Sequence, residues 1–234
     1  MAGIVTGAAR GIGRAAARRL SDGGAGLVLA DLRDAWEDTS LADLSEDRTV
    51  LAPADVRRPE DLEVVARRCR EAFGRIDFVV ANAGTCDTGS LFDGDPQVWR
   101  SVVDTNLLGV AHTLRAVLPA MREQGSGHVI IMASVSGRIS YSGQPLYLAS
   151  KWGVVGLGYA LREEVAPLGI RVTLVEPGLV DTELARATLP ADSSLAGQEA
   201  LAPADVAEAV AFALRQPARV AVNEIVVRPT RQEL

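Results

Sequence analysis

Tyr147 and Lys151 are four residues apart in the run Tyr-Leu-Ala-Ser-Lys. If this run is helical, both side chains lie on one face of the helix. A phenol with a pKa of about 10 is a poor base at neutral pH, but a neighbouring ammonium favours the phenolate. The spacing therefore predicts a tyrosine acid/base tuned by lysine. The alternative for so short a pattern is an ordinary amphipathic surface.

Ser134 and Asn106 are two further candidates. Ser134 follows the apolar run 128–133, and the carboxyl end of a buried parallel strand is the edge where such sheets bind ligands. Asn106 interrupts a helical window from Gln97 to Met121. Its amide can bond the backbone and admit a local distortion, which is either a plain kink or a kink that positions a water molecule.

A glycine-rich stretch, Thr6 to Gly13, lies between a short apolar run and an amphipathic segment. Glycines there let backbone N–H groups and the positive end of the following helix meet a pyrophosphate. A plain structural turn is the alternative. The predicted phosphate cradle comprises Gly7, Arg10, Gly11, Ile12 and Gly13.

Asp31 ends the second apolar run, close to the distance from the glycines at which a dinucleotide fold places an acid on the adenosine ribose. A carboxylate there accepts hydrogen bonds from ribose hydroxyls and repels a 2′-phosphate, which favours NAD over NADP. Arg10 and Arg33 favour NADP if they pair with a phosphate, and are otherwise solvated surface charges.

Two more strand ends face the same predicted crevice. Asp55 and Val56 follow the third apolar run, where Asp55 either faces the adenine or caps a turn. Asn82, Ala83 and Gly84 follow the fourth run, and small residues there let the chain pass close to a nucleotide, although the tripeptide alone indicates only a turn.

Apolar runs alternate with amphipathic helical windows along the whole chain, which predicts a parallel sheet covered by helices on both faces. The predicted strands are 3–6, 27–30, 49–52, 76–81, 128–133, 170–175 and 223–227. Helices are expected at 11–21, 59–73, 97–121 and 203–214, around Tyr147, and as a short helix within 33–48.

Composition narrows the class of protein. The net charge of −6 gives no electrostatic footprint for nucleic acid or an anionic membrane, and no apolar run has the length of a membrane span. The two cysteines and two isolated histidines lack metal-ligand spacing, so no metal is expected. A cytoplasmic enzyme is the simplest expectation.

Taken together, the glycine stretch, Asn82-Ala-Gly84, Asn106, Ser134 and Tyr147-Leu-Ala-Ser-Lys151 resemble the short-chain dehydrogenase/reductase family over nearly the whole chain. The resemblance implies one Rossmann-type domain, residues 1–234, with a seven-stranded doubly wound sheet of order 3-2-1-4-5-6-7. It also implies a substrate-covering segment, residues 180–201, and a homodimer or homotetramer.

The resemblance further implies roles for these residues. Tyr147 would be the acid/base, Lys151 would lower its pKa and bind the nicotinamide ribose, Ser134 would orient the substrate oxygen, and Asn106 would support a relay water. Pro177, Gly178 and Thr182 resemble the loop beside the nicotinamide, with Thr182 as the carboxamide partner.

The expected activity is reversible hydride transfer between a nicotinamide cofactor, NAD or less readily NADP, and a secondary alcohol or ketone. The alternative is a nucleotide-sensing regulatory protein on the same fold without chemistry. The expected pocket wall is mainly neutral and includes Cys86, Tyr141 and Gln144, whereas Arg138 could receive a substrate carboxylate.

Overall fold

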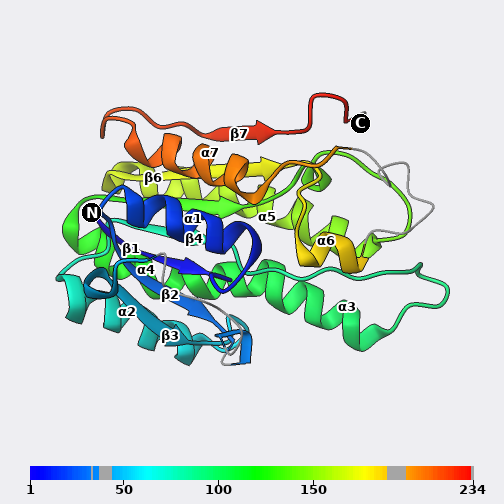
Figure 1. Ribbon diagram of the computed structural model, residues 1–234, viewed down its shortest axis with the longest axis horizontal. Coiled ribbons are helices and arrows are strands. Elements are labelled where there is room, and N and C mark those ends of the chain that lie inside the picture. The colour runs from blue at the N-terminus through cyan, green and yellow to red at the C-terminus, as the bar shows by residue number, and fades with distance from the viewer. Residues whose placement is uncertain (33, 37–43, 189–198, 233–234) are drawn as a thin grey trace.

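Seven parallel strands form one sheet of order β3-β2-β1-β4-β5-β6-β7 in the computed structural model, which describes residues 1–32, 34–36, 44–188 and 199–232 (Figure 1). The predicted fold class and strand order are confirmed. The strands are β1 (Ala2–Thr6), β2 (Gly26–Asp31), β3 (Thr49–Pro53), β4 (Phe78–Ala81), β5 (Gly127–Met132), β6 (Ile170–Pro177) and β7 (Glu224–Val227).

Helices cover both faces of the sheet. One buried apolar cluster joins residues of α2, α4 and α5 to one face, and a second joins residues of α1 and α7 to the other. Because both faces are covered, the central strands are apolar runs rather than alternating patterns. The helices are α1 (Gly11–Asp22), α2 (Pro59–Phe73), α3 (Pro96–Val103), α4 (Gly109–Gln124), α5 (Pro145–Val165), α6 (Glu183–Thr188) and α7 (Pro203–Arg215).

The helical window expected over 97–121 is interrupted at Asn106, as the sequence predicts. Between α3 and α4 the chain forms a π-helical segment, Asp104–Leu108, which contains Asn106. A π turn holds one more residue than an α turn, and such turns occur frequently at functional sites. The predicted distortion at Asn106 is therefore present.

The short helix expected within 33–48 is largely untested, because Arg33 and residues 37–43 lie outside the described residues. In the described part only two short 3₁₀ turns occur, Asp34–Trp36 and Glu46–Arg48. Among the described residues, no helix is both long and apolar enough to cross a membrane.

The carboxyl ends of the strands meet at one edge of the sheet, the side to which the arrowheads point in Figure 1. Asp31 ends β2, Asn82 follows β4, Ser134 lies two residues beyond β5, and Pro177 ends β6. The parallel topology thus gathers at this edge side chains that are far apart in sequence.

His128 is a buried histidine in β5 at the opposite, amino end of the sheet. Its Nε2 lies 2.8 Å from Oγ1 of Thr173, whose hydroxyl donates to the carbonyl of Val222, so Nε2 carries the proton. In the part of the chain that the structure describes, Nδ1 has no partner. Burial, followed by the charge of Arg171, lowers the pKa of His128 from 6.5 to about 3.

We therefore predict that acid destabilises the fold through His128. Because the pKa is lower in the folded protein, stability is full above pH 6.5 and falls as the pH drops from there toward 3. At pH 5 the loss should be about 2 kcal/mol, at about 1.4 kcal/mol per pH unit. Urea unfolding at pH 7 and pH 5 measures this loss as a drop in the free energy of unfolding. His128→Gln should not show the drop, whereas His112→Gln, the control, should show it. Equal pH dependence in the two variants would contradict the assignment.

Candidate active site

The glycine-rich stretch forms the tight turn that the sequence predicts between β1 and α1. Gly7 and Gly11 have φ of 66° and 56°, values that favour glycine, and a Cβ on Gly13 would lie 2.0 Å from the carbonyl oxygen of Gly7. Arg10 precedes α1 and its guanidinium pairs with Glu183 at 3.0 Å, so no side chain caps the first N–H groups of the helix at this position. The backbone at this helix start thus fits an anion such as a pyrophosphate.

The strand ends on either side hold this turn in place. Nδ2 of Asn82 donates to the carbonyls of Thr6 and Gly7 at 3.0 and 3.1 Å. In return, Oγ1 of Thr6 accepts from the backbone N–H groups of Asn82 and Ala83. Asn82 therefore braces the cradle, and a Cβ on Gly84 would crowd Oδ1 of Asn106 at 3.3 Å.

Asp31 lies against the cradle. Its Oδ2 accepts from the backbone N–H of Ala9 at 2.9 Å, and its Oδ1 accepts from that of Leu32 at 2.8 Å. Each carboxylate oxygen keeps a second lone pair, so both can still accept a ribose hydroxyl.

Asp55 and Val56 form a turn before α2. Asp55 accepts from the backbone N–H and the guanidinium of Arg57, and the hydrogen bond to that side chain is the main cause of a lowered pKa for Asp55. Val56 is buried against Gly109, where an added Cβ would come within 2.7 Å of its Cγ2. These contacts fit the alternative in which Asp55 caps a turn. The predicted contact of Asp55 with adenine stays a prediction.

Tyr147, Lys151 and Ser134 come together beside the ends of β5 and β6. Nζ of Lys151 donates to the carbonyl of Met132 at 2.9 Å and lies 5.7 Å from the centroid of the Tyr147 ring. Burial lowers the pKa of Lys151 to about 8, so the ammonium still predominates at pH 7. Burial, with a further contribution from Cys86, raises the pKa of Tyr147 above its usual value, and the neighbouring Ser134 opposes this rise only in part. The phenol thus needs nearby positive charge to ionise.

Asn106 uses its whole side-chain amide to hold neighbouring segments. Its Oδ1 accepts from the N–H of Thr85, and its Nδ2 donates to the Thr85 carbonyl and to Oγ of Ser150. Ser150 in turn donates to the carbonyl of Tyr147 at 2.7 Å. Asn106 thus ties the loop after β4 to α5, and the predicted relay water stays a prediction.

Asp87 is a site residue that the sequence did not reveal. It is 1% exposed, and its carboxylate accepts from the backbone N–H groups of Tyr147 at 2.9 Å and Leu146 at 3.3 Å. It therefore caps α5, the helix that carries Tyr147 and Lys151. The only sequence signal is that Gln144, directly before Pro145, is a poor N-cap residue, so the cap must come from elsewhere.

The segment after β6 covers this region. The methyl carbon of Thr182 lies 3.5 Å from where a Cβ of Gly11 would be, and Gln144 donates to the carbonyl of Thr188 at 3.2 Å. Gln144 also accepts from the Tyr141 hydroxyl at 3.0 Å. Of the expected covering segment, residues 189–198 lie outside the described residues.

Cys86 lies in the same region, since its thiol interacts with Thr188 and with the charge of Lys151. Burial raises the pKa of this thiol to about 12, which keeps it protonated and favours a neutral wall residue over a nucleophile.

Pro177 and Gly178 lie at the end of β6 beside Ser134. The hydroxyl of Ser134 donates to the Pro177 carbonyl at 3.4 Å. A Cβ on Gly178 would lie 2.1 Å from Oε1 of Gln232, which accepts from the N–H of Leu179. A side chain at residue 178 would therefore have to displace Gln232 from its contact with Leu179.

The expectation that Arg138 could receive a substrate carboxylate is wrong. Its guanidinium already binds Glu176 through two hydrogen bonds and Glu224 through a third. Two carboxylates neutralise it, and they would repel a third.

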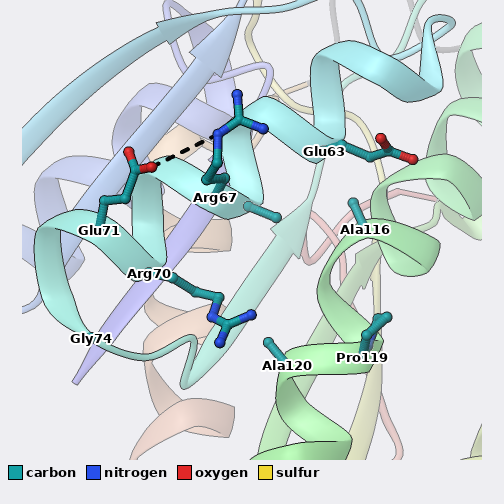
Figure 2. A pocket seen from close by; sticks show the side chains of 9 residues that line it. Glu63, Arg67, Arg70, Glu71, Gly74, Ala116, Pro119 and Ala120 are labelled. Carbon is teal, nitrogen blue, oxygen red and sulfur yellow. Dashed lines mark ion pairs between the residues drawn. The ribbon is translucent and has the colours of Figure 1, made fainter.

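A separate groove of about 570 Å³ lies between α2 and α4 (Figure 2). Its rim carries arginines and glutamates, including the pair Arg67 and Glu71 at 3.8 Å, and no predicted site residue lines it. Within the described ranges, no group of three or more His, Cys, Asp or Glu is placed to hold a metal ion.

Comparison with known proteins agrees with this geometry. The family model described as short chain dehydrogenase matches residues 2–192. An uncharacterized oxidoreductase of Staphylococcus aureus strain MW2 is 38% identical over 226 residues, covering 97% of this chain and 96% of that protein. The chain therefore belongs to the short-chain dehydrogenase family, a family of oxidoreductases.

Two solved structures are similar over the whole chain. Serine dehydrogenase in its closed form, complexed with NADP⁺, has a TM-score of 0.91 and 30% identity, covering 100% of this chain and 97% of that one. An alcohol dehydrogenase from the archaeon Thermococcus sibiricus, complexed with 5-hydroxy-NADP, has a TM-score of 0.88 and 30% identity, covering 100% and 98%.

We predict that Asp87→Ala reduces both stability and turnover. It leaves two partly buried N–H groups at the start of α5 without their acceptor, which should cost about 1–3 kcal/mol and loosen Tyr147. Asp95 caps α3 by accepting from Gln97 at 2.8 Å on the surface, so Asp95→Ala is the matched control, with a cost of about 1 kcal/mol and unchanged turnover. Denaturant unfolding and steady-state rates check both, and equal effects of the two variants would refute a special role for Asp87.

Proposed function

We propose that the chain is an NAD(P)-dependent oxidoreductase that transfers a hydride between a nicotinamide cofactor and a secondary alcohol or ketone. The observation that carries the proposal is the ammonium of Lys151, anchored on the Met132 carbonyl two residues before Ser134 and 5.7 Å from the centroid of the Tyr147 ring, at the ligand-binding edge of the sheet. When bound, the cofactor supplies a hydride acceptor at its nicotinamide C4.

The residues divide the work of alcohol oxidation. Ser134 holds the substrate oxygen, and Tyr147 as phenolate removes the hydroxyl proton while the carbinol carbon gives up its hydride. Lys151 supplies the positive charge that a buried phenol needs in order to ionise. In ketone reduction the same phenol returns the proton.

The proposed cofactor contacts follow the strand ends. Gly7, Gly11 and Gly13 would let the backbone meet the pyrophosphate, Asp31 would bind the adenosine ribose, and Lys151 the nicotinamide ribose. The further proposed contacts are Arg10, Ile12, Asp55, Val56, Asn82, Ala83, Gly84, Tyr147, Pro177, Gly178 and Thr182. The fit of the cradle to an anion and the carboxylate held beside it support this assignment.

We also propose that copies of the chain associate as a homodimer or homotetramer in the cytoplasm. Trp152 of α5 and Leu108 of the π-helical segment are 53% and 44% exposed, and apolar surface of this kind is what a second subunit would bury. The two cysteines are free, as expected in a reducing compartment.

Tyr147→Phe tests the proposed chemistry. Loss of the hydroxyl should lower turnover at least 1000-fold, within the range of about 10²–10⁴ that general acid–base catalysis contributes, while nucleotide affinity changes little. The readouts are NADH formation over a panel of secondary alcohols and nucleotide binding by calorimetry. Unchanged turnover would refute the acid/base role, and nucleotide binding by the wild type without turnover of any substrate would favour a sensing protein.

Asp31 sets the proposed preference for NAD over NADP. Replacing it by Asn removes a negative charge that a 2′-phosphate would meet, so the ratio of kcat/KM for NAD to that for NADP should fall about tenfold or more, or at least 1.4 kcal/mol. Asp77→Asn is the control, because its carboxylate accepts from the N–H of Ala2 at the opposite, amino end of the sheet. An unchanged ratio in Asp31→Asn would place the selectivity elsewhere.

A further inference from the structure

An ion pair between a completely buried carboxylate and a partly exposed guanidinium joins β6 to the segment that follows Ser134. Glu176, in β6, has a completely buried side chain, and Arg138 reaches it from the loop that follows β5. Nε and Nη2 of Arg138 donate to the two carboxylate oxygens at 2.8 and 2.7 Å. Two parallel hydrogen bonds between planar groups fix orientation as well as distance.

The pair connects the two segments that flank the proposed reaction centre. Arg138 follows the 3₁₀ turn Val135–Gly137, which Ser134 caps by accepting from the N–H of Ser136. Glu176 immediately precedes Pro177. Ser134 itself is linked to the β6 segment by one contact among the described residues. Its hydroxyl donates to the Pro177 carbonyl at 3.4 Å. That contact is long for a hydroxyl donor, and the strong link nearby is the backbone hydrogen bond from Ala133 N–H to the Val175 carbonyl at 2.8 Å, which lies before both loops. The loops beyond it are held to each other by the ion pair.

Removing the Glu176 carboxylate from water costs desolvation free energy, and a contribution to stability does not by itself explain why a charged residue lies here. A buried ion pair can often be replaced by apolar residues with no loss of stability, whereas apolar contacts are not directional. A fork of two hydrogen bonds fixes the spacing of the two loops, and hydride transfer is sensitive to displacements of about 1 Å.

We propose that Arg138 and Glu176 are positioning residues that set the distance from Ser134 to the Pro177–Gly178 loop. The inference rests on the proposed function, because it assumes that Ser134 holds the substrate oxygen and that this loop lies beside the nicotinamide. Neither residue touches the reacting atoms, and both act through the segments they join.

The same guanidinium provides a matched control. Nη2 of Arg138 also donates to Glu224 of β7 at 2.7 Å, but Glu224 is 34% exposed and lies on the outer side of the pair. Glu224→Gln removes one of the two negative charges that neighbour Arg138 and leaves the hydrogen bonds between Arg138 and Glu176 in place. Glu176→Gln removes a charge of the same size and one hydrogen bond of the fork.

The test compares the two variants in the full-length protein with an alcohol that the wild type oxidises. Glu176→Gln should lower kcat ten- to a hundredfold, leave the Kd for the nicotinamide cofactor within threefold, and raise the primary deuterium isotope effect at the carbinol carbon. Glu224→Gln should stay within twofold of the wild type on all three measures. A purely structural role would lower the melting temperature and the active fraction without changing the isotope effect.

Arg138→Lys is the second variant, because it keeps the charge beside Glu176 but replaces the fork by a single point of contact. It should lower kcat at least threefold with the same rise in isotope effect, and it decides the matter alone if Glu176→Gln does not fold. A wild-type kcat and isotope effect in folded Glu176→Gln or Arg138→Lys would overturn the proposal.

Tyr147→Phe, measured in parallel, distinguishes a failure of the proposed function from a failure of the positioning role. If it turns over as fast as the wild type, the acid/base assignment is wrong, and a kinetic change in Glu176→Gln would not support the positioning role. If it is inactive while Glu176→Gln resembles the wild type, only the positioning role is wrong.

Discussion

The hydrogen bond from Lys151 to the carbonyl of Met132 is the contact on which the arrangement of the site depends. It joins α5 to the last residue of β5, two residues before Ser134. Tyr147 lies one helical turn before Lys151, so the same contact determines where the phenol stands relative to that serine. The ammonium is buried, and a charge in such a place must be held by polar partners. The Lys151 side chain thus both carries the positive charge of the site and anchors α5 to β5.

Buried polar side chains perform the corresponding task for the loops. Asn82 ties the glycine turn to β4, Asn106 ties the following loop to α5, and Asp87 caps that helix. Each group is desolvated and therefore stable only with its partners in place. Loops that would otherwise be adaptable are thereby fixed at the ends of the rigid strands. The ion pair between Arg138 and Glu176 extends the same principle to the loops behind Ser134.

Much of this could be predicted from the sequence, because the relevant signals are local. Apolar runs fix parallel strands buried on both faces, and the glycines of the cradle have conformations or contacts that exclude side chains. The roles of Asp87 and Glu176 could not be predicted in this way. Each makes its key contacts with residues remote in sequence, and nothing near either residue indicates its partner. Arg138 was misjudged for the same reason, since an arginine near a pocket looks free until its carboxylates are located.

The contact between the covering segment and the glycine turn has a kinetic consequence. Thr182 packs against Gly11, and Glu183 pairs with Arg10, so the two segments meet across the start of α1. On the proposed function, a dinucleotide must part them on entry and again on departure. Its passage would then require this contact to open. Opening would limit steady-state turnover wherever release of the nucleotide is slower than the chemical step.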